Sequence, residues 1–287
     1  MIPTPRTARQ RGFTLAEVAI VFVIVALLIG GTVLTLSAQT EAREIIDTQR
    51  TLDQAREAII GFALRNGRLP CPAPAAGNAI ESFCTNGGAG ACGAIILAPP
   101  GPVPVHGRCS SPNGFVPAAT LGIGPIETNP ASPNFGLLLD SWLQPIRYSV
   151  TQVFSPTPPA NTVMLFTAPG EMKSNILAAP PIAPDLFVCT TSAGALPATP
   201  ACGVGVPSFQ TPAVVYSTGK NFPQQLPGGP AGGADEQDNI HFGAALDRIF
   251  IAHEARPAGA PGGAFDDLVI WISPNILYNR LIAGGAI

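Results

Sequence analysis

The sequence predicts an α+β fold in which one long N-terminal helix packs on an antiparallel β-sheet. Residues 13–36 form an almost unbroken apolar run, long enough for one helix that crosses a bilayer. An apolar stripe with helical spacing then continues to residue 62. Beyond residue 70, short β-branched and aromatic runs alternate with proline- and glycine-rich stretches. A helix followed by several strands is the pattern of an α+β domain.

The N-terminus combines basic residues, a glycine and one carboxylate. Arg6, Arg9 and Arg11 precede Gly12 and the apolar run, and Glu17 lies inside that run. A secretory signal has its cleavage site after the apolar segment, whereas the cleavable-looking part here lies before it. An ionisable side chain within a membrane segment is costly and marks a functional position. The residues around it in the chain are apolar, so we expect it to have no partner there.

Residues 12–17, Gly-Phe-Thr-Leu-Ala-Glu, directly precede the apolar run. This stretch resembles the class III signal of type IV pilins and type II secretion pseudopilins. The resemblance implies that prepilin peptidase cuts after Gly12 and that Phe13 becomes the N-methylated N-terminus. Glu17 would pair with the N-terminal amine of a neighbouring subunit, which offsets the cost of a carboxylate in an apolar bundle. The other implied partners are pilin or pseudopilin subunits, an inner-membrane assembly platform and its ATPase.

These observations divide the chain into a leader (1–12), a transmembrane helix (13–36), an amphipathic continuation of that helix (37–66) and a globular β-rich domain (67–287). The basic leader stays inside by the positive-inside rule. Everything after about residue 37 is therefore expected to face the bacterial periplasm. The protein would be a single-pass inner-membrane protein that later enters a pilus or pseudopilus.

The second half of the helix is predicted from an apolar stripe flanked by charged residues. Asn66-Gly67 and the following Pro70 indicate its end. The stripe consists of Ile45, Leu52, Ala55, Ile59 and Phe62.

The globular part is expected to consist of short strands between long loops. Residues 72–115 and 223–236 are predicted to be loops, and a final helix is predicted over 274–282. The predicted strands are Ile146–Val150, Val163–Thr167, Leu186–Cys189, Val214–Ser217, Ile249–His253 and Leu268–Ile272.

All six cysteines follow the apolar run, which places them in the compartment where disulfides persist. A zinc site is disfavoured because the chain has no Cys-x-x-Cys pair and no clustered histidines; free or mixed thiols are the other alternative to disulfides. Six cysteines allow 15 pairings. Short loops favour Cys189–Cys202 and Cys84–Cys92, which leaves Cys71–Cys109, and the pairing stays open.

Composition limits the function classes further. Charged residues make up 11 % of the chain and the net charge is −3, with basic residues scattered, so nothing supports nucleic-acid binding. The 31 glycines and 32 prolines among 287 residues indicate a loop-rich globular part with a limited core.

Two stretches of the globular part are similar to the major pseudopilin of type II secretion. Residues 140–148, Asp-Ser-Trp-Leu-Gln-Pro-Ile-Arg-Tyr, resemble its Asp-Pro-Trp-Gly-x-Pro-Tyr-x-Tyr stretch, and they are interpreted as a turn and strand that cover the helix. Residues 216–221 resemble its following turn. In that family the loop between these strands binds calcium, which implies Asp235, Asp238 and Asp266 as candidate ligands. A solvated acidic loop, or carboxylates that cap turns, is the alternative.

The function predicted is that of a non-enzymatic filament subunit, assembled into a type II secretion pseudopilus or a type IV pilus. A minor tip subunit that acts as an adhesin or binds secreted substrate is a second hypothesis. A signal-anchored periplasmic enzyme is the third. Ser217-x-x-Lys220 matches a penicillin-binding nucleophile motif, but that serine must open a helix, whereas Ser217 is expected to end a strand. Apart from calcium, the protein is not expected to require a cofactor.

Overall fold

A computed structural model describes residues 14–75, 78–99, 101–156, 161–178, 180–196, 201–222, 233–240, 248–257 and 259–286, with the side chains of 29–38 and Ser208 left out. The chain divides into two compact units, 1–46 and 47–287. The leader (1–12) and Phe13 lie outside the described residues. The four-part division predicted from the sequence stays a prediction.

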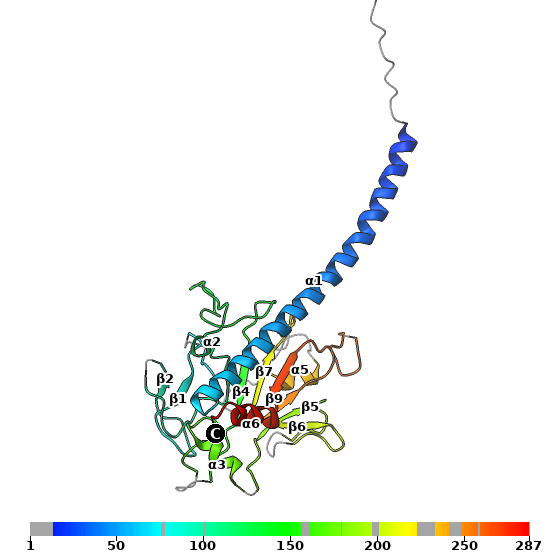
Figure 1. The fold of residues 1–287 in the computed structure, drawn as a ribbon. Helices are drawn as coiled ribbons and strands as arrows, with labels where there is room; N and C mark the ends of the chain where they lie inside the picture. The colour runs from blue at the N-terminus through cyan, green and yellow to red at the C-terminus, as the bar shows by residue number, and fades with distance from the viewer. Residues whose placement is uncertain are drawn as a thin grey trace, which may run out of the picture. The chain divides into compact units, whose positions relative to one another are not determined.

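The long helix α1 runs from Leu15 to Asn66 (Figure 1). In the first unit the apolar side chains of residues 15–28 are exposed. Among the residues that the structure describes, no helix has a stretch long and apolar enough to cross a membrane.

The part of α1 in the second unit is amphipathic. Leu52, Ala55 and Ile59 are fully buried, as the predicted stripe requires, while Phe62 is half-buried. Thr48 adds a buried position one turn earlier, where its Oγ1 accepts a hydrogen bond from the amide of Ser141 at 3.2 Å. Gly67 ends the helix with φ of 65°, the left-handed conformation that glycine adopts without strain. Its amide donates to the Ala63 carbonyl at 2.8 Å.

The main sheet has four antiparallel strands in the order β3-β4-β7-β9; Figure 1 labels β4, β7 and β9. The strands are β3 (Asn113–Phe115), β4 (Arg147–Val150), β7 (Ala213–Ser217) and β9 (Leu268–Ile272). Every residue of β7 is buried, and successive side chains face opposite sides of the sheet. Ala213 and Val215 pack with α1, whereas Val214 and Tyr216 pack with the second sheet. The main sheet is therefore the middle layer of the globular unit.

The second sheet consists of β6 (Ser208–Thr211), β5 (Leu186–Cys189) and β8 (Ile249–Ile251), in that order. β5 pairs antiparallel with β6 and parallel with β8. A two-stranded antiparallel ribbon joins β1 (Ser82–Cys84) to β2 (Ile95–Leu97). The short helices are α2 (Ala118–Leu121), α3 (Glu171–Ile176), α5 (Ala234–Asp238) and α6 (Pro274–Ala283). The predicted α+β class, with a long helix packed on an antiparallel sheet, is confirmed.

Several local predictions were wrong. Residues 163–167 form no strand; their backbone bonds are scattered, with Met164 donating to His106 and Leu165 to Val153. The predicted loop 72–115 contains β1, β2 and all of β3. The predicted loop 223–236 contains the start of α5, with 223–232 outside the described residues. Residues 164–167 are buried, but burial alone does not determine whether a segment forms a strand.

Candidate functional site

The first candidate site is the start of α1, where Thr14 and Glu17 form a capping box. The Glu17 carboxylate oxygen Oε2 accepts from the Thr14 amide at 2.9 Å and from the Thr14 hydroxyl at 2.8 Å. The Glu17 amide in turn donates to the Thr14 hydroxyl at 3.3 Å. This reciprocal pattern satisfies amides that the first helical turn leaves without partners. The expectation that Glu17 has no partner in its own chain was therefore wrong.

The capping box leaves part of the carboxylate available. Both hydrogen bonds that Thr14 donates go to Oε2, and Glu17 is exposed. Within the described residues, its other oxygen, Oε1, accepts no hydrogen bond. One carboxylate can thus close its own helix and still accept from a second donor.

The six cysteines form three disulfides, Cys71–Cys109, Cys84–Cys92 and Cys189–Cys202, and no cysteine is free. This is the pairing that loop length favours. The bridges close loops of very different length, with sequence separations of 38, 8 and 13 residues.

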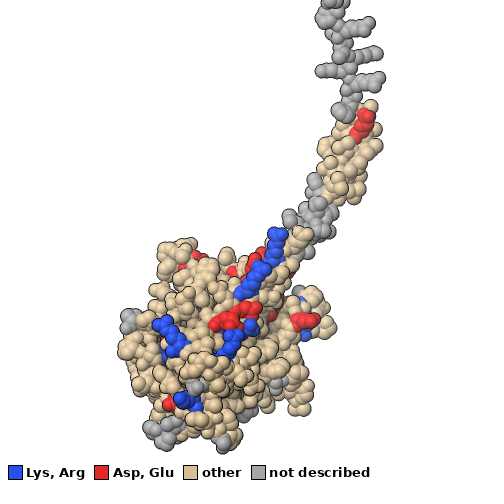
Figure 2. All heavy atoms as spheres, in the orientation of Figure 1, with Lys and Arg blue, Asp and Glu red and all other residues tan. Residues whose placement is uncertain are grey.

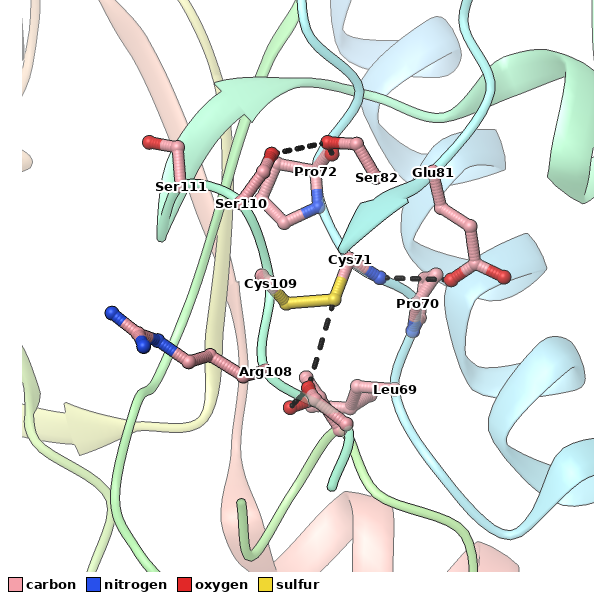
Figure 3. The surroundings of a disulfide bond; sticks show 12 residues. Leu69, Pro70, Cys71, Pro72, Glu81, Ser82, Arg108, Cys109, Ser110 and Ser111 are labelled. Atoms are coloured by element: carbon pink, nitrogen blue, oxygen red, sulfur yellow. Dashed lines mark hydrogen bonds between the residues drawn. A yellow bond between two sulfur atoms is a disulfide. The ribbon is translucent and has the colours of Figure 1, made fainter. Parts of the chain in front are cut away.

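A buried ion pair lies beside the first of these bridges. Figure 3 shows the Cys71 amide directed at the Glu81 carboxylate, to which it donates at 3.1 Å. Arg68 donates to the same carboxylate through both of its terminal nitrogens, at 2.8 and 2.6 Å. The Arg68 and Glu81 side chains are 4 % and 2 % exposed. The pair links the end of α1 to the start of β1. No sequence motif marks these two residues, so the pair was not predicted from the sequence.

Of the three predicted calcium ligands, Asp235 is fully engaged elsewhere. Its Oδ1 accepts from the Ser192 amide and hydroxyl, both at 2.7 Å. Its Oδ2 contacts His253 at 3.1 Å and Arg256 at 2.5 Å. Although burial opposes the charge, these hydrogen bonds lower the pKa of Asp235 to about 2. Asp235, in α5, therefore links the segment after β5 to the segment after β8.

The carboxylates that come together are Glu236, Asp266 and Asp267, whose oxygens lie within 4.8 Å of one another. Asp238, near the end of α5, is not in this group. Glu236 and Asp267 are buried, whereas Asp266 is only half-buried. Of the predicted ligands, only Asp266 therefore lies in the acidic group, and sequence spacing missed the other two members.

Asp266 is the member least compatible with its negative charge. Burial first, and then the neighbouring Glu236, raise its pKa to about 6, although the Asn221 and Lys220 amides oppose this by donating to Oδ2. Its Oδ1 is buried without a hydrogen-bond partner among the described residues. Gly219, with φ of 67°, lets this oxygen approach, because a Cβ there would lie 2.1 Å from it.

This donor set fits a hard divalent cation. All three side chains offer carboxylate oxygens, which Ca²⁺ prefers, and one oxygen lacks a partner. A cation would also relieve the repulsion that raises the pKa of Asp266.

The other motifs have structural roles. Asp140 Oδ1 accepts from the Trp142 and Gln144 amides at 2.9 and 2.8 Å, and its Oδ2 accepts from the Ser217 hydroxyl. Tyr148 is buried in the α1 core and donates to the Pro70 carbonyl at 3.0 Å. Ser217 ends β7 and does not open a helix, so the nucleophile motif lacks its required context.

Comparison with known proteins gives one match. Residues 7–33 match the prokaryotic N-terminal methylation motif. No curated protein and no solved structure matches the chain. The match covers the same stretch in which Thr14 and Glu17 form the first turn of α1. The chain thus carries the prepilin-type signal of the type IV pilin and pseudopilin family.

Proposed function

We propose that this protein is a pilin-like filament subunit, assembled into a type II secretion pseudopilus or a type IV pilus. The observation that carries the proposal is the methylation motif over residues 7–33, joined to a 52-residue helix. The motif implies processing by prepilin peptidase and anchoring in the inner membrane before entry into a filament. A long helix that leads into an α+β globular unit is compatible with this role.

In the proposed maturation, the peptidase cuts between Gly12 and Phe13, and Phe13 is N-methylated. Glu17 then guides assembly, because its Oε1 can accept a hydrogen bond from the N-terminal amine of a neighbouring subunit. The capping bonds from Thr14 support this role by fixing the carboxylate relative to the helix end. The platform protein and its ATPase would drive extraction from the membrane.

We further propose Glu236, Asp266 and Asp267 as the residues that would hold a calcium ion in this protein. Bound there, the ion would supply a positive charge that fixes the turn after β7 to the segment before β9. No chemical step is assigned to it, and the role is structural.

The direct test of maturation is Gly12→Val, which puts a branched side chain at the cleavage position. We expect full-length precursor to accumulate in the membrane fraction, detected by intact-mass spectrometry. Gly30→Val, in the same helix beyond the cleavage position, is the matched control and should mature normally. Normal removal of residues 1–12 in the Gly12→Val protein would contradict the proposal.

Assembly is tested with Glu17→Gln, which keeps the size of the side chain and removes the charge. We expect normal cleavage and a strong loss of the subunit from sheared filaments, measured by blotting. Undiminished incorporation would argue against the role of Glu17 in a filament interior and favour the alternative of a minor tip subunit.

A further inference from the structure

The cysteine-bearing loops, which no family resemblance explains, build a cavity of about 410 Å³. Its wall includes Cys92 and Cys109, so the Cys84–Cys92 and Cys71–Cys109 bridges each fix one side of it. The volume lies in the usual range for small-molecule sites. Two covalent cross-links hold this wall in place independently of any filament contact.

The polar groups of this cavity have hydrogen-bonding capacity left over. Arg108 Nη1, Gln152 Nε2 and Asn113 Oδ1 are buried atoms for which the described residues provide no partner, and all three residues line the cavity. Buried polar atoms are nearly always paired with protein, water or ligand. Two of these atoms, Arg108 Nη1 and Gln152 Nε2, are donors, and these are the groups with which an acceptor in the hollow could pair.

The charge of the cavity is positive. Arg108 and Arg248 line it, and none of the described lining residues is acidic. Arg248 forms an ion pair with Asp185 at 3.0 Å. Arg108 has no carboxylate partner among the described residues; its Nη2 donates to the Gly90 carbonyl. Figure 3 shows its guanidinium extending away from the Cys71–Cys109 bridge, on the side where Ser111 also points.

The remaining wall is apolar. Phe154 and Met164, paired as an isolated β-bridge, lie along it with Pro112. A guanidinium with a free terminal nitrogen recognises a planar oxyanion, while an aromatic ring and a thioether favour an apolar body. We propose that this cavity binds a small organic carboxylate, with its carboxylate at Arg108 and Gln152 and its apolar body against Phe154 and Met164. This inference does not rest on the proposed function.

Two sources can present such a carboxylate: a free organic acid and the C-terminus of a peptide. Benzoate is the probe for the first, and the peptide Ala-Ala-Phe with a free C-terminus is the probe for the second. Benzyl alcohol and the peptide amide are their neutral counterparts. Binding is measured by calorimetry and by thermal shift on the full chain in detergent, with all disulfides intact.

We expect at least one carboxylate probe to bind about tenfold more tightly than its neutral counterpart, because the charge-assisted bond to Arg108 is lost in the latter. The tighter of the two carboxylates identifies the source. Arg108→Gln should weaken binding about tenfold or more, and Phe154→Ala should weaken it without removing the preference for charge. Arg50→Gln, on an exposed arginine of α1, is the control and should bind like the unchanged protein.

If Arg108→Gln lowers the melting temperature too far for binding to be measured, Gln152→Leu gives the same test through the second donor. Equal affinity for charged and neutral probes would overturn the proposal. Binding that survives Arg108→Gln or Gln152→Leu unchanged, or no saturable binding of either carboxylate, would also overturn it and leave ordered water as the partner of these atoms.

Discussion

The N-terminal signal and the globular unit of this protein differ in whether they match known proteins. The first turn of α1 belongs to a motif that matches a known family over residues 7–33, and its chemistry needs only a helix start and one carboxylate. No curated protein and no solved structure matches the chain, although the described part of the globular unit contains three sheets and three disulfides. The signal is a short local pattern, so it can be matched on its own. The globular unit depends on contacts between residues far apart in the chain, which no short pattern specifies.

The helix and the globular unit also differ in how charged side chains are distributed on their surfaces. Figure 2 shows charged side chains in small separate groups on the visible face of the globular unit, and a denser group along the adjoining part of the helix. That part of α1 contains the exposed pairs Arg50–Asp47 and Arg56–Asp53. Such pairs stabilise a helix only slightly, so the globular unit depends on burial and covalent links.

The largest loss of stability is expected from breaking the buried ion pair of the globular unit. Glu81→Gln leaves the Arg68 charge without its counter-ion, and removing one member of a buried pair costs about 3–5 kcal/mol. We expect a large fall in the unfolding midpoint, measured by chemical denaturation of the full chain, with leader cleavage unchanged. Glu57→Gln, in the exposed pair with Arg280, is the control and should shift the midpoint little. Equal effects of the two changes would contradict the importance given to burial.

Removing the longest-range disulfide should have the next largest effect. Replacing both Cys71 and Cys109 by serine releases the loop of 38-residue separation, and one bridge contributes about 2–4 kcal/mol. We expect the melting temperature to fall by several degrees, more than after the same replacement of Cys84 and Cys92, whose loop is shorter. A larger effect of the shorter loop would show that native packing, and not the restriction of the unfolded chain, dominates.

The smallest effect is expected at Asp266, where pH and calcium act together. Its pKa rises from 3.8 to about 6 on folding, so the folded state binds this proton more tightly than the unfolded state. Stability therefore falls as pH rises from 3.8 to about 6, by about 1–2 kcal/mol once partial exposure is allowed for. Calcium should restore stability near neutral pH and do little at about pH 4. Calorimetric melting curves of the full chain with and without chelator measure this.

Asp266→Asn is the matched variant for that experiment. It should remove both the loss of stability with rising pH and the response to calcium, because the added charge is gone. Asp238→Asn, outside the acidic group, should keep both. A calcium response that survives Asp266→Asn would place the ion elsewhere.

Local rules predicted the helix and most strands correctly. The stripe at Leu52, Ala55 and Ile59 is buried as its spacing requires, and β4, β5, β7 and β9 lie where β-branched residues accumulate. The features that the sequence did not predict depend on contacts between separate segments of the chain. The Arg68–Glu81 pair joins residues 13 apart without a motif, and Glu236 meets Asp266 only because Asn221 and the Asp266 amide both bind it. The Thr14–Glu17 capping box, in contrast, is a local pattern that the sequence contained.

The parallel pairing of β5 with β8 affects the order in which the globular unit can form. Phe187 lies opposite Ile249, so this contact needs a chain segment of more than sixty residues to be in place first, whereas β6 reaches β5 from much nearer in the chain. Contacts between distant residues form slowly, because loop closure costs entropy before the contact contributes any stability. Until the chain has been extended to residue 251, one edge of β5 stays open to other strands. Open edges promote aggregation, so the interval between the formation of β5 and that of β8 is the period in which the incomplete chain most needs isolation from its neighbours.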